Sequence, residues 1–144
     1  MMESPAISRI HKQWNDFAKS GNVDGLIGLY APDAVLETPL IPAILDRRSG
    51  VLRGHDEIRH FFDEGTKRRP NELVRWHRSD NYFTDGKTLI WEYPRETPTG
   101  DQVDILEVMD IENDLIRHHR IYWGWFGTEL LVRSAVSKAL ATKE

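Results

Sequence analysis

The feature that most constrains this chain is one long β-hairpin over residues 102–125, whose apolar face also carries charged side chains. Asn113-Asp114 is a two-residue turn signal that sets Glu112 opposite Leu115. Because strand side chains alternate, this register fixes every later pair. One face then holds Val103, Ile105, Glu107, Met109 and Ile111 against Gly124, Tyr122, Arg120, His118 and Ile116. A register one residue away would bury three acidic side chains, so we do not expect it.

This register places Glu107 directly opposite Arg120, with His118 next along the same face. Charged groups are costly to bury among apolar side chains unless they are paired. Two interpretations stay open. The residues form a structural ion pair that holds the hairpin register, or they mark a pocket in which Arg120 binds an oxyanion and Glu107 or His118 moves a proton.

The opposite face of the hairpin predicts a subunit contact. It pairs Asp110 with Arg117, Val108 with His119, Leu106 with Ile121 and Asp104 with Trp123. Four of these side chains, Leu106, Val108, Ile121 and Trp123, are too apolar for an exposed strand surface. We therefore expect a homodimer through the outer face of the sheet.

Length and composition indicate one globular domain over residues 1–144, with a C-terminal helical extension over 127–144. A content of 29% charged residues is ordinary for a soluble globular protein, and the net charge of -4 argues against a nucleic-acid surface. The absence of cysteine excludes disulfides and thiolate chemistry and fits a reducing compartment. The N-terminal residues lack an apolar signal core, and no apolar run has membrane-spanning length. We expect a cytoplasmic protein without a nucleic-acid or membrane partner.

Hydrophobic periodicity and capping residues predict helices over residues 5–20, 22–30, 55–66 and 128–141 and a short strand over 34–38. Residues 73–83 and 88–96 precede the hairpin and complete four consecutive antiparallel strands. Helices followed by a meander of long strands predict an α+β domain, with helices on one face of a curved antiparallel sheet. Residues 39–54 read as an irregular loop that either covers a pocket or packs on the core or on a second subunit.

A curved sheet and its helices enclose a hollow, and aromatic side chains are expected to point into it. They are Trp14, Phe17, Phe61, Trp76, Trp91, Tyr93 and Tyr122. These rings either fill the space or line a ligand cavity. If Glu96 lies opposite Gln102, then Trp91 neighbours Glu107 on the inner face.

No metal or cofactor site is expected. His55 and His60 are five residues apart, so on a helix their rings diverge by about 140°. His118 and His119 are adjacent on a strand and point to opposite faces. The sequence also has no glycine-rich phosphate loop, no GxSxG elbow and no dinucleotide fingerprint.

Three segments resemble those of the nuclear transport factor 2-like (NTF2-like) superfamily, particularly its SnoaL-like and ketosteroid-isomerase-like small proteins. They are GNVDGLIGLYAPDAVLETP, GHDEIRHFF and LIRHHRIYWGW, and the similarity covers roughly residues 5–126. The resemblance implies a cone-shaped curved sheet packed on N-terminal helices, a cystatin-like fold, with the extra C-terminal helix outside it. The fold hosts many activities, so the activity depends on the site residues.

When the functional residues of these enzymes are compared with this chain one by one, only one position keeps its functional group. Ketosteroid isomerases have a general-base aspartate where this chain has Thr38, and an oxyanion-binding tyrosine where it has Trp14. Their second acid aligns with Glu107, which keeps the carboxyl group. The catalytic aspartate of SnoaL-like cyclases aligns with Gly124. Neither chemistry is implied intact.

Two hypotheses follow. The first is a small-molecule-binding protein that acts as a cofactor-independent isomerase, lyase or hydrolase on a small apolar substrate. Its catalytic residues would be Glu107, Arg120 and His118, and its substrate site would be lined by Trp14, Phe17, Thr38, Phe61, Trp76, Trp91, Tyr93 and Tyr122. The alternative is a non-catalytic ligand-binding or dimerisation module with a structural Glu107–Arg120 ion pair.

Overall fold

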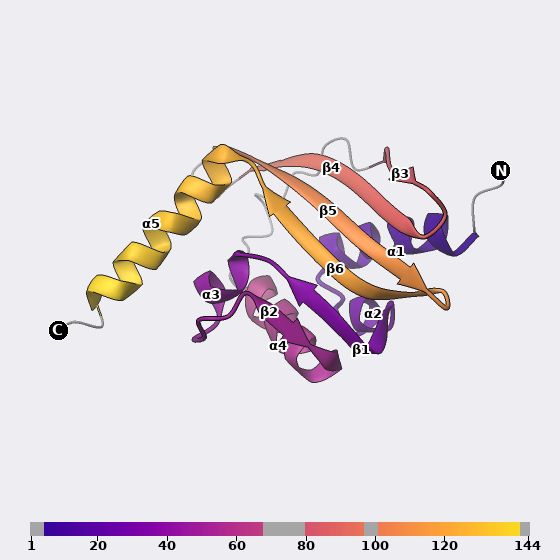
Figure 1. Ribbon diagram of the computed structural model, residues 1–144, viewed down its shortest axis with the longest axis horizontal. Helices are drawn as coiled ribbons and strands as arrows, with labels where there is room; N and C mark the ends of the chain where they lie inside the picture. The colour runs from indigo at the N-terminus through magenta and orange to yellow at the C-terminus, as the bar shows by residue number, and fades with distance from the viewer. Residues whose placement is uncertain (1–4, 68–79, 97–100, 142–144) are drawn as a thin grey trace.

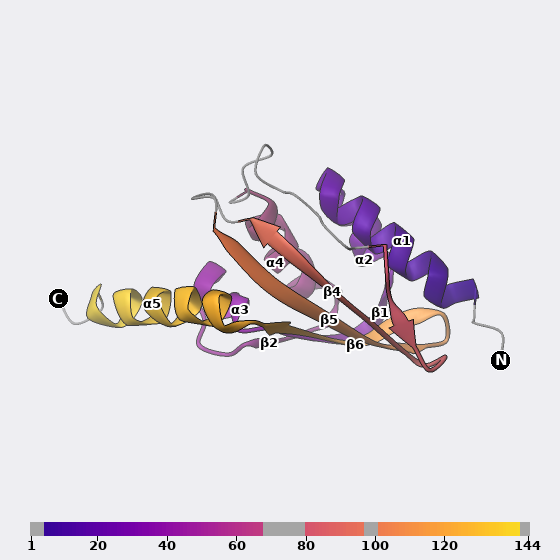
Figure 2. The ribbon, with the colours of Figure 1, turned by 90° about the horizontal axis from the view of Figure 1, so that it is seen from above.

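A curved sheet, in the order β2-β1-β6-β5-β4-β3, carries α1, α2 and α4 on one face (Figures 1 and 2). The computed structural model describes residues 5–67, 80–96 and 101–141. Its elements are α1 (Pro5–Ser20), α2 (Val23–Ile27), β1 (Tyr30–Glu37), α3 (Leu40–Ile44), β2 (Val51–Arg53), α4 (Gly54–Lys67), β3 (Phe83–Thr84), β4 (Thr88–Glu96), β5 (Gln102–Glu112), β6 (Leu115–Trp123) and α5 (Trp125–Ala141).

The predicted fold class is confirmed, and the order of strands adds one non-local pairing. β1 lies parallel to β6, whereas the other neighbours in the sheet are antiparallel. The register of β4 on β5 is the predicted one, with Glu96 opposite Gln102 and Trp91 opposite Glu107. Most of the strand predicted over 73–83 falls outside the described residues.

The helices pack through the stripes that periodicity predicts. Ile7, Ile10 and Trp14 of α1 are buried in the core against the sheet. Gly25 lets α2 approach α1, because a Cβ there would lie 2.8 Å from the ring of Phe17. The second helix is shorter than predicted: Tyr30 begins β1 instead of ending the helix.

The segment predicted as an irregular loop over 39–54 contains α3 and β2. Ile41, Leu45 and Leu52 are buried in the main core. Packing on the core, one of the alternatives for this segment, therefore describes these side chains.

A β-bulge in β6 overturns the predicted register of the β5–β6 hairpin. The turn forms as predicted, with Asn113 and Asp114 at φ 54° and 63°, and Glu112 lies opposite Leu115. The register then shifts between Ile111 and Asp110. Beyond the shift the opposed pairs are Asp110–His118, Met109–His119, Val108–Arg120, Glu107–Ile121, Leu106–Tyr122 and Ile105–Trp123.

The predicted pairing of Glu107 with Arg120 is therefore wrong. A bulge inserts one extra residue into one strand and so reverses the faces of all residues beyond it. The reversal turns Ile121 and Trp123 toward the core and leaves Arg120 and Tyr122 on the outer face. Burying two apolar side chains in place of a guanidinium and a phenol explains why the bulged register is favoured.

Helix α5 begins at Trp125, earlier than the predicted Thr128, and projects from the body of the protein (Figures 1 and 2). Its first turn packs on Trp123, and a Cβ at Gly127 would lie 2.5 Å from Trp123 Cε3. Lys138 Nζ donates hydrogen bonds to the carbonyls of Pro42 and Ala43, which tie the helix to α3. Within the described ranges, no helix combines the length and apolar character that a membrane span requires.

Candidate functional site

A chain of hydrogen bonds crosses the protein interior from α1 to β4. Trp14 Nε1 donates to Tyr30 Oη at 3.0 Å, and Tyr30 Oη lies 2.9 Å from His119 Nδ1. His119 Nε2 lies 2.6 Å from Glu107 Oε2. Tyr93 Oη donates to the other oxygen, Glu107 Oε1, at 2.8 Å. The five side chains come from α1, β1, β6, β5 and β4, so the chain joins four neighbouring strands to one helix.

The indole of Trp14 sets the direction of the first hydrogen bond in this network. An indole nitrogen only donates, so Tyr30 Oη accepts from Trp14 and is free to donate its own proton to His119 Nδ1. With the imidazole neutral and its proton on Nε2, His119 in turn donates to Glu107. In that tautomer every hydrogen bond of the network points toward the Glu107 carboxylate.

Burial makes this network energetically demanding. Glu107 is 2% exposed and His119 is 0% exposed. Burial raises the pKa of the Tyr30 phenol well above its ordinary value, and the hydrogen bond from Trp14 opposes that shift only in part. Tyr30 therefore stays protonated and acts as a donor. A buried carboxylate is costly unless several donors satisfy it, and two do so directly here.

Aromatic rings surround the network. The ring of Trp14 lies 5.5 Å from that of Trp91 and 5.7 Å from that of His119, both edge-on. Trp91 lies opposite Glu107 on the neighbouring strand. Its Nε1 is buried and has no hydrogen-bond partner among the described residues. The interior thus holds one indole N–H that an oxygen of a ligand could accept from.

Arg120 and His118, predicted beside Glu107, lie on the other face of the sheet. Arg120 forms two hydrogen bonds with Asp110, at 2.8 and 3.0 Å. His118 pairs with Glu37 of β1. Their predicted positions at the Glu107 site are wrong, because the bulge turns both side chains outward.

The predicted lining residues divide into three groups. Those buried in the interior are Trp14, Thr38, Phe61, Trp91 and Tyr93, and Phe17 is partly buried against the same core. Tyr122 is 52% exposed on the outer face, so its predicted inward position is wrong. Trp76 lies outside the described residues.

Two members of the network, His119 and Tyr30, were missing from the predicted site. The unbulged register placed His119 on the outer face, and the helix prediction extended over Tyr30. A signal for His119 is present in the sequence. His119 is in phase with the apolar Ile121 and Trp123, whereas Arg120 is in phase with Tyr122.

No metal site is evident in the part of the chain that the structure describes. No group of three or more histidine, aspartate or glutamate side chains there could hold an ion.

Comparison with known proteins agrees with this architecture. Residues 11–119 match the family model of the SnoaL-like domain. No curated protein matches the sequence. A SnoaL-like protein from Burkholderia thailandensis E264 is similar in structure, with 18% identity over 85% of this chain and 98% of that one and a TM-score of 0.66.

Two further solved structures share the fold. An NTF2-like protein from Mesorhizobium loti has 16% identity over 87% of this chain and 96% of that one, with a TM-score of 0.67. A protein with a cystatin-like fold from Methylobium petroleophilum PM1 has 17% identity over 87% and 80%, with a TM-score of 0.66. At these identities the likeness concerns the fold alone.

The first prediction concerns the donor on β4. Tyr93→Phe removes a hydrogen bond to a buried carboxylate, so we expect the free energy of unfolding to fall by about 1–3 kcal/mol. Tyr122→Phe, at a half-exposed phenol, is the matched control and should change it by less than about 0.5 kcal/mol. Urea unfolding at pH 7 measures both. Equal effects of the two substitutions would contradict a buried, charge-bearing network.

The second prediction concerns pH. The hydrogen bonds from Arg120 hold the pKa of Asp110 below its ordinary value. A lowered folded-state pKa stabilises the protein above the unfolded pKa, which is about 3.9, and this contribution is lost as the pH falls through the folded-state pKa. In Arg120→Gln we expect the pKa of Asp110 to rise and this loss of stability in acid to shrink.

Carboxyl ¹³C NMR titration of Asp110 and urea unfolding at pH 7 and pH 3 measure the two effects. Arg133→Gln, on the remote α5, removes the same charge and should leave the Asp110 titration unchanged. An Asp110 titration that is identical with and without Arg120 would contradict the assignment.

Proposed function

The chain belongs to the family of SnoaL-like domains, and from that premise we propose that it binds a small, largely apolar molecule between the helices and the sheet and acts on it by cofactor-independent acid/base chemistry. The fold by itself does not select a reaction. The proposal therefore depends on the residues of the interior.

The observation that carries the proposal is the Glu107–His119 pair, with 2.6 Å between Glu107 Oε2 and His119 Nε2, inside an aromatic interior. A carboxylate held by oriented donors can take a proton from a substrate and return it elsewhere, as an isomerase or lyase requires. In this role Glu107 is the base. His119 holds the carboxylate in position through its contact with Glu107 Oε2. The Nε1–H of Trp91 would donate to the substrate oxygen on which negative charge develops.

The interior favours a neutral substrate. The buried polar and charged residues that the structure describes are His11, Asn15, Thr38, Glu107 and His119, which include no arginine or lysine. Because Arg120 lies on the outer face, none of the buried polar groups offers a fixed positive charge that could hold an anionic substrate in the interior. A small ketone or enone, which offers an acidic C–H and one oxygen acceptor, fits Glu107 and Trp91 best.

A non-catalytic ligand-binding module is the second candidate, and one observation favours it. Trp14, Tyr30, His119, Glu107 and Tyr93 bond to one another in an unbroken series, so no member of the series needs a ligand. On this interpretation the carboxylate serves to tie the strands and α1 together.

Exchange of carbon-bound hydrogen in D₂O separates the two candidates. We expect the protein to catalyse deuterium uptake into members of a panel of small neutral ketones and enones, followed by ¹H NMR. Glu107→Gln should slow the exchange at least about a hundredfold, because general acid/base catalysis contributes 10²–10⁴-fold. Glu112→Gln, at an exposed position on the same strand, is the control and should exchange at the normal rate.

Near-UV circular dichroism establishes that the Glu107→Gln variant is folded. Unchanged exchange in that folded variant would remove Glu107 from the mechanism. Saturable quenching of tryptophan fluorescence by panel members, without any exchange, would favour the non-catalytic candidate.

We also propose that the protein is a homodimer, through the outer face of the sheet and α5. Leu106 and Val108 keep their predicted outward orientation, whereas Ile121 and Trp123, expected in this surface, turn toward the core. Helix α5 adds an exposed apolar surface, with Trp125 at 79% exposure and Val132, Val136 and Leu140 also exposed.

The charges on the outer face are compatible with such burial. Asp110 is paired with Arg120, whose strand neighbour Val108 belongs to this apolar surface. A second copy of the chain that packs on Leu106 and Val108 would therefore meet this pair without having to supply a counter-ion. The exposed apolar side chains provide the driving force.

Sedimentation equilibrium tests the dimer. We expect the wild-type protein to have twice the mass of one chain, and Val136→Glu to weaken the dimer at least about tenfold, because it places a charge in an apolar contact. Ser20→Glu, which adds the same charge at the exposed end of α1, should leave the mass unchanged. A wild-type protein that sediments as a monomer at every concentration would contradict the proposal.

A further inference from the structure

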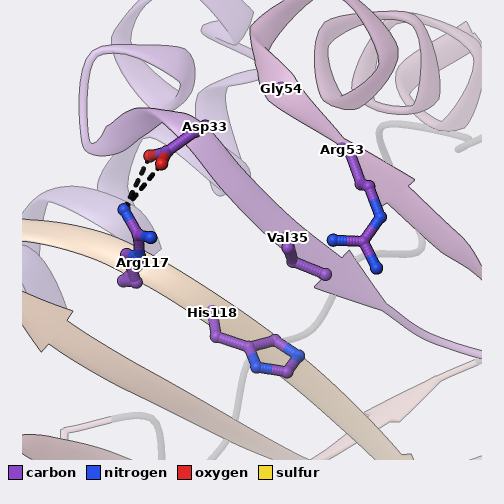
Figure 3. A pocket seen from close by; sticks show the side chains of 6 residues that line it. All are labelled: Asp33, Val35, Arg53, Gly54, Arg117 and His118. Atoms are coloured by element: carbon purple, nitrogen blue, oxygen red, sulfur yellow. Dashed lines mark hydrogen bonds and ion pairs between the residues drawn. The ribbon is translucent and has the colours of Figure 1, made fainter.

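An open groove of about 560 Å³ lies on the outer face of the sheet, apart from the interior site. Its walls are Asp33, Val35, Arg53, Gly54, Arg117 and His118 (Figure 3). His118 and His119 are neighbours on β6, yet the first faces this groove and the second is buried against Glu107. The groove is therefore separated from the interior site by the thickness of the sheet.

The backbone builds this groove at two irregularities that coincide. The pairing of β1 with β6 shifts register between Tyr30 and Val35, and the bulge of β6 falls at Arg117. A bulge directs two successive side chains to one face, which places Arg117 and His118 together on the outer side. Val35 then lies between Arg53 on β2 and His118 on β6, because it is the register partner of both.

Three of the residues that line the groove have basic side chains, and two of these three are paired with a carboxylate. Arg117 pairs with Asp33 at 2.8 Å, and His118 is occupied by Glu37. The guanidinium of Arg53 has no hydrogen bond or ion pair with any residue that the structure describes. Glu57, which accepts from the backbone N–H of Arg53, is already paired with the side chain of Arg47.

We propose that this groove binds a small organic carboxylate, with the carboxylate on Arg53 and the hydrocarbon part on Val35. A guanidinium offers two parallel N–H donors that match the two oxygens of a carboxylate, and it favours planar groups. Val35 supplies an apolar floor between the two arginines, as Figure 3 shows. The volume is within the range of sites that hold small molecules.

NMR titration with benzoate tests the proposal directly. We expect saturable shifts of the backbone amides around Val35, Gly54 and His118 in the ¹H–¹⁵N spectrum. Benzamide, a neutral molecule of nearly the same shape, should shift these amides little. Arg53→Gln, which removes the charge and the guanidinium but keeps a polar side chain, should raise the dissociation constant of benzoate about tenfold or more.

Two control variants separate the effect of Arg53 from a general loss of positive charge and from the interior site. Arg133→Gln removes one positive charge on α5, far from the groove, and should bind benzoate as the wild type does. Glu107→Gln should also bind benzoate normally, since the groove does not depend on the interior site. Failure of the interior mechanism would therefore leave this result unchanged.

Three outcomes would overturn the proposal. One is equal binding of benzoate by Arg53→Gln and the wild type, and another is equal binding of benzoate and benzamide. The third is tighter binding of inorganic phosphate than of benzoate, because the apolar floor would then contribute nothing.

Discussion

The hydrogen bond between His119 Nε2 and Glu107 Oε2 is the interaction on which the interior of this protein depends. Glu107 is on β5, and its two donors come from the strands on either side, Tyr93 on β4 and His119 on β6. Through Tyr30 and Trp14 the same series reaches β1 and α1. A buried carboxylate without donors would be strongly destabilising, so the packing of four strands and one helix has to keep these donors in place.

The same requirement orients the groups that a reaction would use. Tyr30 Oη lies 2.9 Å from His119 Nδ1, and burial raises the pKa of Tyr30, so the phenol beside the imidazole stays protonated. A base whose oxygens are fixed before a substrate arrives does not have to reorganise during a proton transfer. Stability and acid/base chemistry thus make the same demand on Glu107, namely fixed neighbours in a buried site.

Local signals in the sequence were sufficient for much of the fold. The stripe of α1, the Asn113-Asp114 turn and the register of β4 on β5 were all predicted, because periodicity and turn residues act over short distances. The bulge was not predicted, since a register extended from the turn assumes unbroken alternation. At the far end of β6, alternation with the apolar Ile121 and Trp123 places His119 on the inner face. Near the turn, alternation with the inward Ile116 would place His119 on the outer face, so the two ends agree only if one residue is inserted between them. That conflict is the sequence evidence for a bulge.

One backbone irregularity therefore sets both faces of β6. The extra residue turns His119 toward Glu107 and, in the same step, directs Arg117 and His118 to the outer groove. A strand without the bulge would place Arg120 against Glu107 and remove His119 from the interior. The Glu107 carboxylate would then be paired with the guanidinium of Arg120, a permanent cation that neutralises its charge. The bulge instead gives the protein a buried carboxyl group whose hydrogen-bond partners are His119 and Tyr93 and not a guanidinium.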